Sequence, residues 1–206
     1  MYQFTGWFIA LGFPLMARSL MEMTRIPLLS ALIYYGVFGI LIRLCVFGRL
    51  PYFRISVKNV RSELVLFALS AVFCSVLYIR GVAAPAAPDG GMIANLFVFA
   101  LLNGSFEHLV WVNIYELAGW RNQYLGVLAC TLYVSLIHVV FWSCFIPSPA
   151  GGSAWLFILS QLLVLWIPLR IYVKTGDLTI WSIQHILYNM LAVLIGGFSL
   201  GMYLHY

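Results

Sequence analysis

Charged residues are scarce in this chain of 206 residues: they make up 8% of it, against 64% for hydrophobic residues. Soluble globular domains carry about 25% charged residues, so the scarcity excludes an ordinary water-soluble fold. The mean hydropathy of +1.00 indicates an integral membrane protein. The net charge of +5 would suggest nucleic-acid binding in a soluble protein. Its basic residues lie mainly in loops, however, so it indicates membrane topology and no nucleic-acid partner.

The sequence also lacks a cleavable signal peptide, paired cysteines, a linker and internal repeats. No basic residue precedes the apolar run Met1–Pro14 and no small-residue cleavage site follows it, which predicts a retained helix and not a signal peptide. The four cysteines form no close pair of the metal-binding or redox kind. There is no linker and no internal repeat, which predicts one membrane domain over residues 1–206 and disfavours an inverted-repeat transporter.

Apolar stretches of near-spanning length recur along the chain. A transmembrane helix needs about 20 apolar residues. The sequence therefore predicts an all-α, polytopic transmembrane helix bundle with about seven spans, within a range of six to eight. The stretches are 4–20, 27–47, 63–83, 93–117, 124–146, 154–173 and 179–202.

Basic residues predict the orientation of these spans. The loop between the second and third spans is rich in Lys and Arg, which is typical of a cytoplasmic loop. Arg25 and Arg80 oppose this assignment. The N-terminus is nevertheless expected in the cytoplasm, because most basic residues agree: Arg49, Arg54, Lys58, Arg61, Arg121, Arg170 and Lys174.

Ionisable residues inside the predicted spans are the strongest functional signal. Glu107, His108, His138 and His185 all lie at membrane depth. A charge there costs a few kcal/mol, so such residues normally face the bundle interior with a partner. The structural alternative is a set of interhelical hydrogen bonds, each contributing about 0.6 kcal/mol.

Depth estimates favour a shared site. At 1.5 Å rise per residue, Glu107 lies roughly 15 Å from the cytoplasmic end of its span, His138 roughly 21 Å, His185 roughly 9 Å and Asn189 roughly 15 Å. His185 and Asn189 share one helix face, four residues apart, as do Asn103 and Glu107. Within an error of roughly 5 Å, Glu107, His138, His185 and Asn189 are expected to occupy one layer.

This set of side chains predicts hydrolytic chemistry. A carboxylate beside an imidazole can activate water, which assigns Glu107 and His138 as catalytic. His185 and Asn189 can donate hydrogen bonds to the oxyanion of a tetrahedral intermediate. No GxSxG motif offers a covalent nucleophile. The combination predicts a peptidase that needs neither a nucleophilic side chain nor a cofactor.

Three motifs resemble one known family. Residues 174–194, KTGDLTIWSIQHILYNMLAVL, carry a Thr-Gly lead-in and then His185-x-x-x-Asn189. Val134-Ser-Leu-Ile-His138 and Glu107-His108-Leu-Val-Trp-Val112 precede them. Together they resemble the CAAX-protease and bacteriocin-processing family of glutamic-type intramembrane proteases, over a core of about residues 100–200. The resemblance implies water activation by Glu107 and His138, an oxyanion hole of His185 and Asn189, and no metal.

The first motif departs from the family pattern. His108 stands where the family carries a second glutamate, and Val112 stands where it carries an arginine. We expect His108 or Asn113 to replace the tether that this arginine provides. Glu116, near the cytoplasmic end, is expected to pair with Arg121 or water. In the turn before the last span, Gly176 is expected to end one helix in a left-handed conformation, and Asp177 or Thr179 to cap the next.

The resemblance also implies a substrate class and a location. The expected substrate is a membrane protein or peptide cut near the bilayer, such as a leader, a bacteriocin or a C-terminal sorting signal. The expected location is the cell membrane of a prokaryote. The oligomeric state has no sequence signal.

Three alternatives remain open. A non-catalytic membrane scaffold could bind a peptide or partner helix on the same fold. A metal site could form from Glu107, His138 and His185, although no His-Glu-x-x-His motif is present. A proton-coupled carrier could use an intramembrane Glu and His relay, although repeat symmetry is missing.

Overall fold

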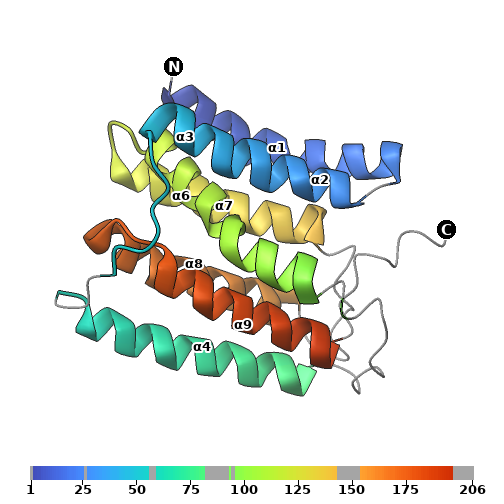
Figure 1. The fold of residues 1–206 in the computed structure, drawn as a ribbon, viewed down its shortest axis with the longest axis vertical. Helices are drawn as coiled ribbons and strands as arrows, with labels where there is room; N and C mark the ends of the chain where they lie inside the picture. Colours follow the sequence, from blue (N-terminus) through green and yellow to red (C-terminus); the bar gives the residue numbers. More distant parts are fainter. Residues whose placement is uncertain are drawn as a thin grey trace. The chain divides into compact units, whose positions relative to one another are not determined.

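The computed structural model describes residues 2–25, 27–55, 59–81, 93, 96–142 and 154–196. Within these residues the only regular structure is helical, which confirms the all-α prediction (Figure 1). The helices are α1 (Tyr2–Thr24), α2 (Pro27–Ile33), η1 (Tyr34–Leu41), α3 (Ile42–Phe47), α4 (Arg61–Gly81), η2 (Leu96–Asn103), α6 (Gly104–Ala118), α7 (Gln123–Val140), α8 (Ala154–Thr175) and α9 (Thr179–Gly196).

The helix boundaries follow the predicted apolar stretches to within a few residues. The stretch 27–47 is one continuous helical run made of α2, η1 and α3. The stretch 93–117 contains η2 followed directly by α6. The elements η1 and η2 are π-helices, a local widening that hydrophobic periodicity does not predict. The loops expected outside the membrane, 81–91 and 146–153, fall almost wholly outside the described residues.

The chain divides into two compact units. Unit 1 comprises residues 1–50, 106–145 and 200–206, and so contains α1, α2, η1, α3, most of α6, and α7. Unit 2 comprises residues 51–105 and 146–199, and so contains α4, η2, α8 and α9. The expectation of a single membrane domain stays a prediction.

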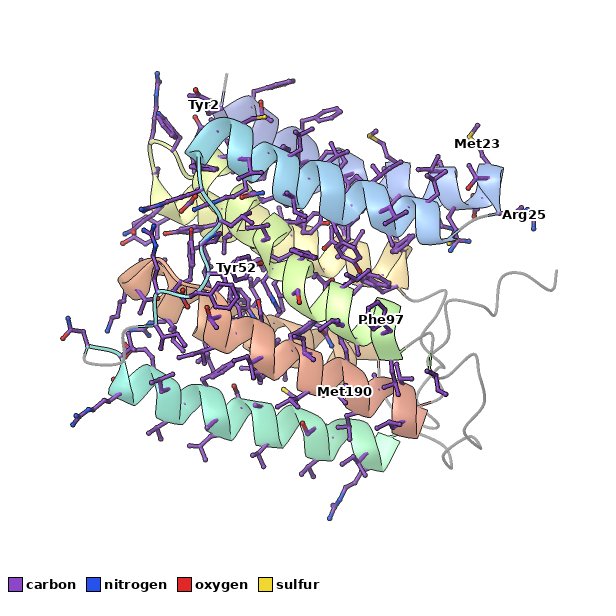
Figure 2. The ribbon with its side chains drawn as sticks, in the orientation of Figure 1. Tyr2, Met23, Arg25, Tyr52, Phe97 and Met190 are labelled. Atoms are coloured by element: carbon purple, nitrogen blue, oxygen red, sulfur yellow. The ribbon has the colours of Figure 1, made fainter. Side chains whose placement is uncertain are left out.

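Among the described residues, unit 1 contains three helical runs that are long and apolar enough to cross a membrane: Tyr2–Thr24, Leu29–Phe47 and Gln123–Val140. Figure 2 shows Tyr2 at one end of α1 and Met23 with Arg25 at the other. Large apolar side chains such as Phe4 (76% exposed) and Leu15 (61% exposed) remain on the surface of α1. An exposed apolar surface of this kind suits lipid, and these three helices support the assignment to a membrane.

Small residues let the helices of unit 1 pack closely. α1 packs against α7 and α2. A Cβ atom added at Gly6 would lie 2.3 Å from the backbone N of Ala118, so α1 and α6 touch through their main chains. The fully buried side chains Trp111, Tyr34 and Tyr133 form the aromatic centre of the unit.

In unit 2, α4 packs against α8 and α9, and α9 packs against η2 (Figure 1). An ion pair between Lys174 and the buried Glu63 ties the end of α8 to the start of α4. Cys74 of α4 lies fully buried, with its Sγ 3.7 Å from the carbonyl oxygen of Ser160 in α8. In unit 2, α4 and α9 are thus each packed against two other helical elements.

The turn before α9 is built as the sequence predicts. Gly176 has φ of 68°, the left-handed conformation that ends α8. Asp177 Oδ1 accepts a hydrogen bond from Thr179 N at 2.8 Å, which caps α9. Asp177 Oδ2 also accepts one from Arg54 N at 2.7 Å, and Thr179 Oγ1 accepts one from Phe53 N at 2.7 Å. This turn fixes where α9 starts.

We expect Gly104→Ala to destabilise unit 2, because α9 leaves no room for a side chain there. An added Cβ would lie 2.6 Å from both the backbone N and Cγ1 of Ile186, next to His185. Overpacking of this kind costs about 1–3 kcal/mol, and backbone gives way less readily than a side chain. Thermal unfolding of the purified protein in detergent measures the effect.

Gly36→Ala is the matched control, since a Cβ at Gly36 meets nothing within 4 Å. It should leave the melting temperature unchanged or raise it slightly, because alanine favours helix over glycine. Equal melting temperatures for Gly104→Ala and Gly36→Ala would contradict this account of the packing.

Candidate functional site

Glu107 is held inside unit 1 by two side-chain donors. It lies in the first turn of α6 and is 1% exposed. Its Oε1 accepts hydrogen bonds from Trp142 Nε1 at 2.9 Å and from Tyr34 OH at 3.4 Å. A buried carboxylate is costly unless such donors replace water. Residues from three separate segments therefore converge on this carboxylate.

Trp111 connects Glu107 to His108 and His138. It lies one turn after Glu107 on α6, and its Nε1 donates to Tyr34 OH at 3.3 Å. The Trp111 ring makes edge contacts with His108 and His138, at centroid distances of 4.9 and 6.2 Å. Glu107 and His138 thus belong to one buried cluster, formed with Tyr34, Trp111 and Trp142. We call it the Glu107 cluster.

His138 is oriented by its own helix. It is 5% exposed, near the C-terminal end of α7, and its Nδ1 lies 2.7 Å from the carbonyl oxygen of Val134. A carbonyl can only accept, so Nδ1 carries the hydrogen. In the neutral imidazole, Nε2 is then the nitrogen that can accept a proton. The backbone of α7 thereby sets the tautomer suited to a base.

His185 and Asn189 lie in unit 2, on successive turns of α9. They are 2% and 4% exposed, and the His185 ring centroid lies 6.2 Å from that of Tyr188. Among the residues that the structure describes, Asn189 Nδ2 has no hydrogen-bond partner. A buried amide donor of this kind is costly to leave unpaired and is suited to a ligand oxygen.

The supporting residues fall into both units. Asn103 ends η2 in unit 2 and is 2% exposed. His108 is fully buried in unit 1 against Trp111. Asn113 Nδ2 donates to the carbonyl oxygens of Phe38 and Gly39, both at 2.8 Å. Asn113 therefore ties α6 to η1, and the expectation that it or His108 replaces the arginine of the family motif stays a prediction.

Glu116 is a correction to the sequence analysis. It pairs with Arg43 of α3, whereas the sequence predicted Arg121 or water as its partner. Arg43 is 5% exposed, whereas Arg121 is on the surface. The prediction considered only the nearest basic residue in the sequence, but the folding of α3 beside the end of α6 brings a more distant one closer.

Sequence reasoning missed Tyr34 and Trp142 as partners of Glu107. Trp142 lies four residues after His138, and Trp111 lies four after Glu107, so the helical spacing carried a signal. Aromatic residues make up 17% of the chain, however, and most serve as packing. Tyr34 had no such signal, because it comes from a helix distant in sequence.

A metal site was one alternative that the sequence left open. Within that part of the chain, no group of three or more His, Cys, Asp or Glu residues is placed to hold a metal ion. The structure therefore offers no ligand cluster in support of a site made by Glu107, His138 and His185.

Comparison of the chain with known protein families, curated proteins and solved structures finds no match. The resemblance to glutamic-type intramembrane proteases accordingly rests on the three motifs and stays a prediction. The geometry of the Glu107 cluster and of α9 does not depend on this resemblance.

Proposed function

We propose that this protein is an intramembrane endopeptidase of the glutamic type. It would be a polytopic bundle of about seven spans in the cell membrane of a prokaryote, with its N-terminus in the cytoplasm. Its substrate would be a membrane protein or peptide cut near the bilayer. The three apolar helices of unit 1 support the membrane part of this proposal.

The proposed reaction is hydrolysis by an activated water molecule. The carboxylate of Glu107 takes a proton from water as the water oxygen attacks the carbonyl carbon of the scissile bond. His185 and Asn189 donate hydrogen bonds to the oxyanion that forms. The C–N bond then breaks, and the proton passes to the leaving amine. Nε2 of His138 orients the water or shares that proton.

One observation carries the proposal: a glutamate 1% exposed lies in one cluster with a histidine whose tautomer is fixed. Trp142 and Tyr34 both donate to Oε1, so protein donors fix the orientation of the carboxylate beside His138. Buried acid–base pairs of this kind concentrate at functional sites.

A non-catalytic scaffold is the second candidate, and the burial of the same cluster favours it. Glu107 already accepts two hydrogen bonds from protein donors, and the position of a second family acid is taken by His108, which is 0% exposed. A carboxylate satisfied in this way also fits a structural role that fixes helices around a partner-binding surface.

Co-expression with tagged membrane-anchored reporters separates the two candidates. The reporters carry a leader, a bacteriocin precursor or a C-terminal sorting signal next to one transmembrane helix. We expect one of them to give a discrete product, identified by the mass of its new terminus, with wild type and not with His138→Ala at matched expression. The same product from His138→Ala would contradict the proposed role of this histidine, and intact reporters throughout would favour the scaffold.

A further inference from the structure

A pocket lined by both charged and aromatic side chains in unit 1 lies apart from the Glu107 cluster. Its volume is about 410 Å³, within the range of small-ligand sites. It is formed by the end of α3, the end of α6 and the start of α7. The residues that line it are Arg43, Phe47, Arg49, Tyr115, Glu116, Gly119, Trp120 and Gln123.

The pocket lies where the membrane-spanning candidates of unit 1 end. The run Leu29–Phe47 finishes at the pocket wall, and Gln123–Val140 starts there. The third run, Tyr2–Thr24, also starts nearby, because the rings of Tyr2 and Trp120 lie 4.7 Å apart. Figure 2 shows Tyr2 at this end of α1. Trp and Tyr are typical of the depth of lipid headgroups, so the pocket would open at the membrane surface.

The charges of the pocket favour an anion. Two guanidinium groups, Arg43 and Arg49, and one carboxylate, Glu116, line the pocket, which gives the lining side chains a net charge of +1. Gln123 begins α7, and the N-terminus of a helix adds a partial positive charge. The lining side chains and the start of α7 therefore concentrate positive charge at the end of unit 1 where the pocket lies.

Arg43 is held in a fixed position within this pocket. It pairs with Glu116, its Nε donates to the carbonyl oxygen of Arg49 at 3.3 Å, and its guanidinium carbon lies 4.3 Å from the centre of the Phe47 ring. Arg49 is exposed and not bound to a carboxylate by any ion pair in the described residues. A fixed guanidinium beside an exposed one suits a phosphate group.

We propose that this pocket binds the phosphate of an anionic phospholipid. Lipid is the favoured source of phosphate because two spanning candidates begin or end at the pocket and a third starts next to it, at the depth where headgroups are concentrated. Trp120, which lines the pocket, is 57% exposed, and its apolar ring offers a surface for an acyl chain. Basic pockets between helices at a membrane surface commonly take such headgroups.

Lipid retention by the purified protein tests this proposal. Native mass spectrometry would measure apparent affinities for phosphatidylglycerol and for zwitterionic phosphatidylcholine, in wild type, Arg49→Gln and Arg49→Lys. Arg61→Gln is the matched control, since Arg61 is also exposed but lies in unit 2. One charge at a membrane surface is worth about fivefold in affinity, so Arg49→Gln should weaken phosphatidylglycerol binding by about fivefold.

We expect wild type to bind phosphatidylglycerol more tightly than phosphatidylcholine. Arg49→Lys should keep this preference, and Arg61→Gln should keep the affinity for phosphatidylglycerol within about twofold. Arg49→Gln should reduce it. Equal retention of the two lipids would overturn the proposal, and so would equal effects of Arg49→Gln and Arg61→Gln. A second arm adds inorganic phosphate at millimolar concentration. Inorganic phosphate is not expected to displace the lipid. Displacement would show that the pocket binds soluble phosphate and would overturn the proposal of a lipid ligand.

Discussion

Glu107→Gln is expected to slow peptide cleavage by a factor of about 10² to 10⁴, the usual contribution of a general base. Glutamine has nearly the same shape, and its amide oxygen can still accept hydrogen bonds from Trp142 and Tyr34. It cannot take a proton from water at neutral pH. Product formation from a cleaved reporter, measured over time at matched expression, gives the ratio of rates.

Glu22→Gln is the control for the loss of one carboxylate. Glu22 is exposed on α1, and its Oε1 lies 2.6 Å from Arg18 Nε in a surface ion pair. Such pairs contribute about 0–1 kcal/mol, so this variant should cleave at the wild-type rate. Equal cleavage by Glu107→Gln and Glu22→Gln would exclude Glu107 as the base.

Asn189→Asp is expected to lower kcat by a factor of about 10² to 10³, with a much smaller change in KM. Loss of one oxyanion donor has this effect in other hydrolases. The substitution replaces the buried Nδ2 donor by a carboxylate oxygen of the same size, which repels an oxyanion. Initial rates over a range of reporter-peptide concentrations separate kcat from KM.

Met190→Ala is the control on the same helix. Met190 adjoins Asn189 but is 37% exposed and carries no hydrogen-bond donor (Figure 2). It should retain kcat within a few-fold. A rise in KM with unchanged kcat in Asn189→Asp would assign Asn189 to substrate binding in the ground state instead of the transition state.

The positions of the helices could be predicted from the sequence because apolar stretches are separated by charged or Gly/Pro-rich segments. The stretch 27–47 coincides with the run from α2 to α3, and Gly176 with Asp177 marks the start of α9. The π-helical widening of η1 and η2 was not predictable from apolar periodicity. In η1 the carbonyl oxygens of Phe38 and Gly39 accept hydrogen bonds from Asn113, a residue distant in sequence.

The candidate site could be predicted only in part. Buried polar residues in apolar helices are a strong signal, and Glu107, His138, His185 and Asn189 are all at most 5% exposed. The sequence was less informative about which of these four residues lie together. The sequence placed all four in one layer by depth, whereas the structure describes Glu107 with His138 in unit 1, and His185 with Asn189 in unit 2.

The remaining contacts arise between helices that are distant in sequence. Tyr34 and Glu107 are 73 residues apart, as are Arg43 and Glu116. Helical spacing relates residues three or four positions apart and has no bearing on such pairs. The role of Tyr34 and the partner of Glu116 therefore required the structure.

Hydrolysis by the purified protein in lipid nanodiscs, with a metal chelator present, tests the central claim most directly. The readout is the rate at which wild type and Glu107→Gln cut the same reporter peptide. The account predicts cleavage by wild type in the chelator and a rate at least about 100-fold lower for Glu107→Gln. Equal rates for the two proteins, or wild-type cleavage that is lost in the chelator and restored by added metal, would contradict it.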